Sequence, residues 1–78
     1  MGTIQSRGFA LKIFPKDHEP VHAHVEFDKG VLIIGFSDDE VTPLEIRGTV
    51  RAPDVKKALF AAAVVYDAVL AEWKKMQR

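Results

Sequence analysis

Alternating hydrophobic and polar positions predict β-strands in the first half of the chain. The clearest alternation covers residues 21–27, where every second position is apolar: Val21, Ala23, Val25 and Phe27. The positions between them are His22, His24 and Glu26. A period of two places these two sets on opposite faces of a strand. A strand at about residues 8–14 is predicted in the same way, with Phe9, Leu11 and Ile13 on one face.

Two further segments complete the predicted sheet. The apolar run over residues 31–36 does not alternate, which is typical of a central strand buried on both faces. Asp28-Lys29-Gly30 before it reads as a hairpin turn, with Gly30 in the left-handed position. Pro43 cannot donate to a strand ladder, so residues 44–47 are predicted as a possible edge strand.

Spacings of three and four predict one long helix over about residues 54–77. Pro53 and Asp54 are typical of its first turn, and Lys74 and Lys75 suit its last turn. The apolar stripe consists of Val55, Leu59, Ala62, Tyr66, Val69, Trp73 and Met76. The predicted fold is α+β: a three- to four-stranded antiparallel meander with one long C-terminal helix packed on one face. Residues 1–78 are expected to form a single domain.

This helix is apolar well beyond its core stripe. At about 1.5 Å per residue it would be roughly 36 Å long, more than a small sheet can cover. A helix that is apolar nearly all round is usually buried nearly all round, so the surplus predicts a protein partner or a homodimer. The candidate interface residues are Phe60, Ala61, Val64, Val65, Ala68 and Trp73.

Composition narrows the possible function classes. The 78 residues include no cysteine, which excludes disulfides and cysteine-ligated zinc. Lys+Arg and Asp+Glu are both 11, so no basic excess supports a broad nucleic-acid-binding face. The chain shows no apolar run of membrane-spanning length and no leader, so we expect a soluble, cytoplasmic protein.

The candidate chemistry lies in one segment, because all 3 histidines fall within it. His18, His22 and His24 could bind a divalent metal such as zinc, with Asp17, Glu19 or Glu26 completing the shell. Two histidines could also serve as acid and base in a small hydrolase or nuclease. The third interpretation is a solvated polar strand face with no chemistry. No recognisable nucleophile or phosphate-binding loop accompanies them, which favours a non-enzymatic role.

This segment resembles a family of small prokaryotic proteins, domain of unknown function 4160. The resemblance is carried by Asp17-His18-Glu19-Pro20-Val21-His22-Ala23-His24-Val25 and by Leu70-Ala71-Glu72-Trp73. Val21 stands where the family usually has a second proline, and residues 37–51 match poorly. The resemblance implies a sheet-plus-helix fold and gene neighbourhoods similar to toxin–antitoxin or mobile-element pairs, but no established activity.

The leading functional prediction is a small binding module that acts through protein–protein contacts. Its role would be that of an antitoxin-like accessory or a mobile-element or phage-type inhibitor of a larger complex. The alternative is a histidine-cluster metal-binding protein, or a small hydrolase or nuclease that uses His18, His22 and His24.

Overall fold

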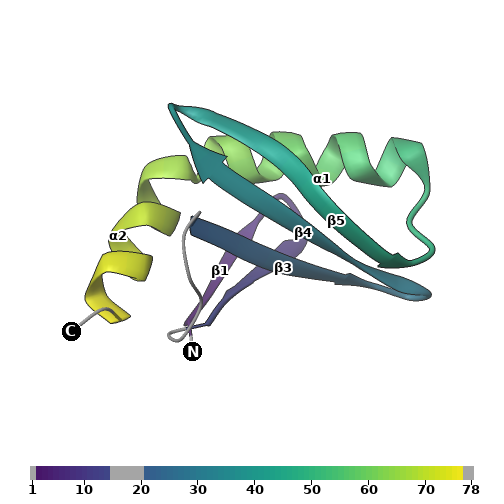
Figure 1. Ribbon diagram of the computed structural model, residues 1–78, viewed down its shortest axis with the longest axis horizontal. Coiled ribbons are helices and arrows are strands. Elements are labelled where there is room, and N and C mark those ends of the chain that lie inside the picture. Colours follow the sequence, from purple (N-terminus) through teal and green to yellow (C-terminus); the bar gives the residue numbers. More distant parts are fainter. Residues whose placement is uncertain (1, 15–20, 77–78) are drawn as a thin grey trace.

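The computed structural model describes residues 2–14 and 21–76, which form an antiparallel sheet followed by two helices (Figure 1). The strands are β1 (Gly2–Ser6), β2 (Phe9–Ile13), β3 (Val21–Phe27), β4 (Gly30–Ser37) and β5 (Glu40–Gly48). The helices are α1 (Ala52–Val64) and α2 (Tyr66–Met76). The predicted α+β class and antiparallel meander are therefore confirmed.

The strands follow one another in space in chain order, β1-β2-β3-β4-β5. The β1–β2 turn has positive φ at Arg7 and Gly8, and the β4–β5 turn has positive φ at Asp38 and Asp39. Two left-handed residues in a two-residue turn match the twist of the strands that it joins. The prediction that Gly30 adopts a left-handed conformation is wrong. Glycine is needed there because a Cβ atom would lie 2.6 Å from the carbonyl oxygen of Thr49.

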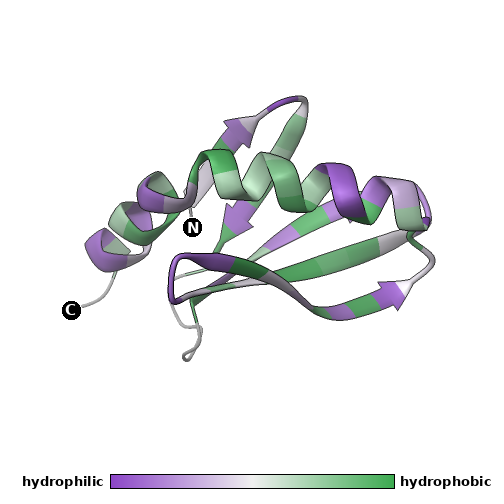
Figure 2. Cartoon of the chain, turned by 90° about the horizontal axis from the view of Figure 1, so that it is seen from above, coloured by the Kyte–Doolittle hydropathy of each residue, from purple (hydrophilic) through white to green (hydrophobic). Residues whose placement is uncertain are grey.

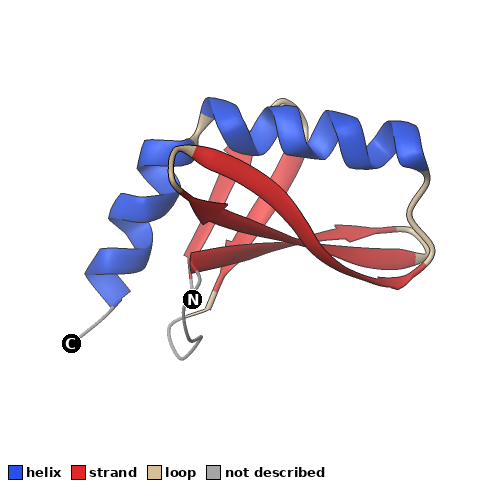
Figure 3. Cartoon of the chain, turned by 45° about the horizontal axis from the view of Figure 1, so that its top comes forward, coloured by secondary structure: helices blue, strands red, loops and turns tan. Residues whose placement is uncertain are grey.

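Both helices pack on the same face of the sheet (Figure 3). The core lies between that face and the helices. The alternation in β3 is confirmed, because Val21, Ala23 and Val25 are buried while His22 and His24 are only partly buried. Figure 2 shows the hydrophobic residues of the strands and the more polar turns that join them. The buried cluster consists of Leu11, Ile13, Val21, Ala23, Val25, Leu32, Ile34, Phe36, Ala58, Ala62 and Val69.

The sheet is larger than the sequence pattern predicted. Strand β1 was missed, because its five residues carry only one large apolar side chain, Ile4. The possible strand at 44–47 extends from Glu40 to Gly48 and lies at the edge, as Pro43 indicated. A register shift opposite Ile33 and Ile34 accommodates one extra residue of β5.

The prediction of one long helix is wrong, because the chain bends at Val65. The Val65 N–H donates to the Ala62 carbonyl, one residue short of the usual helical acceptor, Ala61. The Ser6 hydroxyl of β1 donates to the Ala61 carbonyl instead, at 2.8 Å. The adjacent valines 64 and 65 are weak helix formers, since β-branched side chains lose rotamer freedom there.

The bend gives α2 a surface to pack on, and α2 turns down beside the strands rather than continuing along α1 (Figure 1). Val69 is fully buried, and Trp73 and Met76 pack against the core from one side. Every residue of the predicted stripe is therefore in the core or in contact with it. The bend therefore lets α2 bury apolar side chains that one straight helix would have left exposed.

No helix in the described parts of the chain has both the length and the hydrophobicity needed to cross a membrane.

Candidate functional site

The outer flank of α1 carries the most exposed large hydrophobic side chains among the described residues. Phe60 is 57% exposed and Val64 is 58% exposed, and they lie one turn apart on the helix. The residues of α1 that are fully buried are Ala58, Ala61 and Ala62. The completely buried positions of this helix are therefore all alanines, Val55 and Leu59 are partly buried against the core, and Phe60 and Val64 point outward.

The β1–β2 turn lies beside this flank and contributes a cation to it. The two-residue turn sets the direction of Arg7, whose guanidinium carbon lies 4.7 Å from the centre of the Phe60 ring. An arginine over an aromatic face is attracted by the negative potential of the ring. Phe9 follows directly, at the start of β2. The buried hydrogen bond from Ser6 to Ala61 fixes the turn against the helix.

Between the turn and the helix lies a cleft of about 590 Å³, which we call the basic cleft. It is lined by Arg7, Phe9, Lys56, Lys57 and Phe60. The lining thus combines three cations with two phenyl rings and contains no carboxylate. Within residues 2–14 and 21–76, none of the three cations forms an ion pair. The cleft is therefore electrostatically suited to an anionic ligand that also carries an apolar group.

The predicted interface residues separate into two groups. Phe60, Val64 and Ala68 are exposed. Val65 and Trp73 are partly buried and pack against the core, and Ala61 is fully buried. The bend at Val65 also places Ala68 and Trp73 on α2, so the six residues do not form one continuous helix face.

The second candidate site is on the sheet face that the helices leave uncovered. His22 and His24 project from β3, with ring centroids 5.5 Å apart and ring planes inclined by 20°. The centre of the Phe14 ring lies 4.8 Å from the centre of the His24 ring, and the two ring planes are inclined by 59°. His18, Asp17 and Glu19 lie outside the described residues.

Glu26 is a predicted acidic ligand beside these histidines on β3. Its carboxylate accepts a hydrogen bond from the Lys12 ammonium at 3.0 Å. In the described part of the chain, no three His, Asp or Glu side chains are grouped so that they could hold a metal. A metal site with three such ligands from one chain would therefore need a residue outside the described ones, and the three-histidine site stays a prediction.

Sequence reasoning missed Arg7 and Phe9 as parts of a site. The sequence pattern did not predict β1, so no hairpin turn was expected at Arg7 and Gly8. The pattern that could have predicted this hairpin is Arg7-Gly8 between two short segments of strand-forming residues, since two-residue turns favour glycine. Lys56 and Lys57 were visible only as two charged positions near the start of the predicted helix.

Comparison of the chain with models of known protein families, with curated proteins and with solved structures finds no match.

Proposed function

We propose that the protein is a small binding module that holds a partner protein in the basic cleft and on the adjacent Val64 side chain. The observation that carries this proposal is the outward position of Phe60, 57% exposed, beside three cations that have no acidic partner in the described chain. Exposed apolar groups beside charges are typical of protein interaction sites.

The cleft chemistry favours an acidic peptide segment that contains one aromatic or large aliphatic side chain. Exposed ion pairs contribute only about 0–1 kcal/mol each, so the cations mainly select and orient the partner. The apolar side chain would supply most of the affinity by covering Phe60 and Phe9, because buried apolar area stabilises at about 25 cal/mol per Å².

A phosphate ligand fits this position less well than a carboxylate. Phosphate sites on helices use the free N–H groups of the first turn. Lys56, Lys57 and Phe60 lie beyond that turn, where the backbone N–H groups are used within the helix. The first turn itself carries Asp54, whose carboxylate repels an anion.

The test uses a fluorescein-labelled peptide of Asp and Glu residues around a single Phe, together with a version in which Ala replaces Phe. Fluorescence anisotropy would measure binding to the wild type, to Lys56→Glu/Lys57→Glu and to the control Lys74→Glu/Lys75→Glu. We expect the cleft variant to bind at least about tenfold more weakly, equal to about 1.4 kcal/mol. We expect the control, which makes the same charge change on α2, to bind like the wild type.

Three results would contradict the proposal. The Phe-containing and Ala-containing peptides could bind equally, which would leave the aromatic side chains without a role. The two double variants could lose affinity equally, which would indicate a general charge effect. Adenosine triphosphate could bind in the cleft more tightly than the peptide, which would indicate a nucleotide site.

The biological role that we propose is that of an antitoxin-like accessory or a phage-type inhibitor of a larger complex. A binding module of this size acts by occupying a surface of its partner. The resemblance of residues 14–25 to domain of unknown function 4160 is consistent with this role, because such genes often lie beside other small genes.

A histidine metal site is the second candidate function. The favouring observation is that His22 and His24 lie on one strand face with their ring centroids 5.5 Å apart, and imidazole is a common zinc ligand. A zinc titration by calorimetry, repeated on His22→Ala and on His24→Ala, distinguishes this candidate from the peptide-binding one. The same variants decide whether a hydrolase or nuclease activity depends on the pair.

A further inference from the structure

Strand β5 forms one edge of the sheet and is exposed along nearly its whole length. It is the last strand in the sheet order, and every residue except Val41 is exposed. Within the described residues no strand pairs with its outer edge. Ile46 and Leu44 are 45% and 47% exposed, unusually high for large apolar side chains in a strand. An unpaired edge with apolar side chains is a template for pairing with another strand.

The strand register shows which β5 residues direct their backbone groups outward. Phe27 and Gly30 close a two-residue turn, so Gly30 bonds to β3. Alternation along β4 then directs the backbone groups of Leu32 and Ile34 toward β3 as well. Their β5 partners, Ile46 and Pro43, therefore point their backbone groups at the free edge.

The two halves of this edge differ in their ability to pair. Pro43 has no N–H to offer, and the irregularity that follows it bends the strand. These features protect the first half from pairing with another strand. From Glu45 to Gly48 the register with β4 is regular again, and Ile46 presents both an N–H and a C=O outward.

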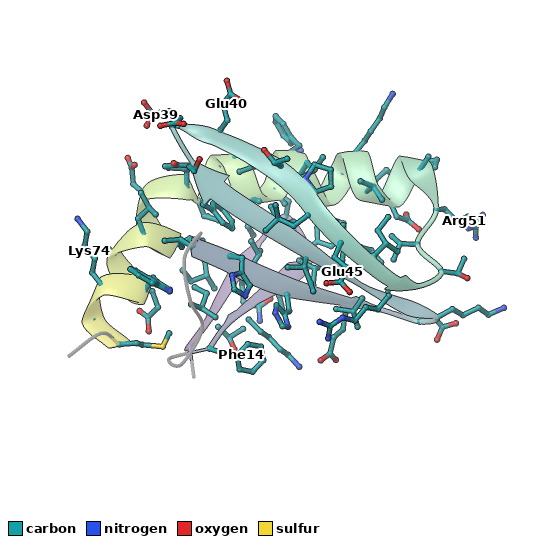
Figure 4. All side chains as sticks on the ribbon, in the orientation of Figure 1. Phe14, Asp39, Glu40, Glu45, Arg51 and Lys74 are labelled. Atoms are coloured by element: carbon teal, nitrogen blue, oxygen red, sulfur yellow. The ribbon has the colours of Figure 1, made fainter. Side chains whose placement is uncertain are left out.

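The charges on this second half are self-complementary. Glu45 and Arg47 lie on the same face of β5, on either side of Ile46. Within one chain they already interact, because the Arg47 Nε atom donates to Glu45 at 3.0 Å. Figure 4 labels Glu45 on β5, well away from Asp39 in the β4–β5 turn and from Glu40 at the start of the strand.

We propose that a second copy of this chain pairs with β5 in antiparallel fashion, about a two-fold axis that passes Ile46. This register places Ile46 opposite Ile46 of the second copy, where both residues direct their backbone groups at the shared edge. It also places each Glu45 opposite the Arg47 of the other copy, twice by symmetry. Registers centred on Glu45 or on Arg47 would place like charges opposite each other, which is unfavourable.

This interface goes beyond the proposed function and does not depend on it. It uses the outer edge of β5, whereas the basic cleft is lined by the β1–β2 turn and by α1. A dimer would join the two sheets into one continuous sheet and would carry two basic clefts. An acidic partner with two binding segments could then bind both clefts at once.

Charge exchange across the interface provides the test, with mass measured by light scattering and sedimentation over a concentration series. We expect the wild type to dimerise, and Glu45→Arg and Arg47→Glu to raise the dimer dissociation constant by at least about tenfold. An equal mixture of these two variants should form a heterodimer, since every like-charge contact becomes an opposite-charge contact. The double variant Glu45→Arg/Arg47→Glu should dimerise like the wild type.

Lys74→Glu is the control for a general charge effect, because it lies on α2, away from β5, and we expect it to leave the dimer unchanged. Circular dichroism of each single variant, compared with the wild type, would confirm that monomers are folded. A wild type that stays monomeric at millimolar concentration would overturn the proposal. So would a mixture of the two single variants that does not associate, or a dimer that both single variants leave intact.

Discussion

Helix α1 carries apolar residues on both flanks, but its completely buried residues are all small and its most exposed apolar residues are large. The inner flank buries Ala58, Ala61 and Ala62 completely, whereas the outer flank leaves Phe60 and Val64 more than half exposed. An ordinary amphipathic helix does the reverse, because large apolar groups gain most from burial. The difference shows that hydrophobicity alone does not identify the face of this helix that belongs to the core.

Close approach of the helix to the sheet explains the inner flank. Alanine has the shortest apolar side chain, so α1 can lie near the large residues of the sheet, such as Leu32 and Phe36. Protein interiors are packed about as densely as organic crystals, so a larger side chain has no space there. The outer residues are under no such constraint, and Phe60 and Val64 contribute little to the core. Their exposure is the basis of the binding site that we propose.

The largest expected effect comes from enlarging the inner flank. Ala62→Leu adds three carbon atoms at a fully buried position, and overpacking of this kind typically costs about 1–3 kcal/mol. We expect the midpoint of urea denaturation to fall accordingly. Ala63→Leu is the matched control, because Ala63 is the next residue and is exposed, so its effect should stay within about 0.5 kcal/mol. Equal losses at the two positions would show that the flanks are not different.

A smaller loss is expected where β1 meets the end of α1. Ser6→Ala removes the hydroxyl that donates to the Ala61 carbonyl at the helix bend. A buried acceptor left without its donor costs about 1–3 kcal/mol, and we expect a value in the lower half of that range. Denaturation of Ser37→Ala, an exposed serine at the end of β4, provides the reference. If the two variants unfold at the same urea concentration, the hydroxyl does not support the bend.

The sequence predicted the parts of the fold that depend on a long, regular pattern. The apolar residues that alternate in β3, and those at spacings of three and four from Val55 to Met76, were correctly predicted to face the core. Such spacings repeat with the strand or helix period, so they place apolar side chains on one face. The bend at Val65 could not be predicted, since the Ser6 hydroxyl that donates to the Ala61 carbonyl there is 55 residues away in the chain. Propensity describes only local preferences, so such a distant contact leaves no local pattern.

The candidate site was predicted in part. Phe60 and Val64 were identified because the helix has more apolar residues than one stripe needs. Arg7 and Phe9 were not identified, because they lie beside α1 only through the β1–β2 hairpin. That hairpin was hard to detect, since Ile4 is the only large apolar residue of β1. The relation of His18 to the pair His22 and His24 lies outside the described residues.

The double variant Phe60→Ser/Val64→Ser is expected to change stability least. The same variant is expected to weaken peptide binding most. The measurement compares its urea denaturation and its affinity for the acidic Phe-containing peptide with those of the wild type. We predict that the free energy of unfolding changes by less than about 1 kcal/mol, since both sites are exposed, while the affinity falls at least about tenfold. Unchanged affinity, or a loss of stability as large as that of Ala62→Leu, would contradict the account.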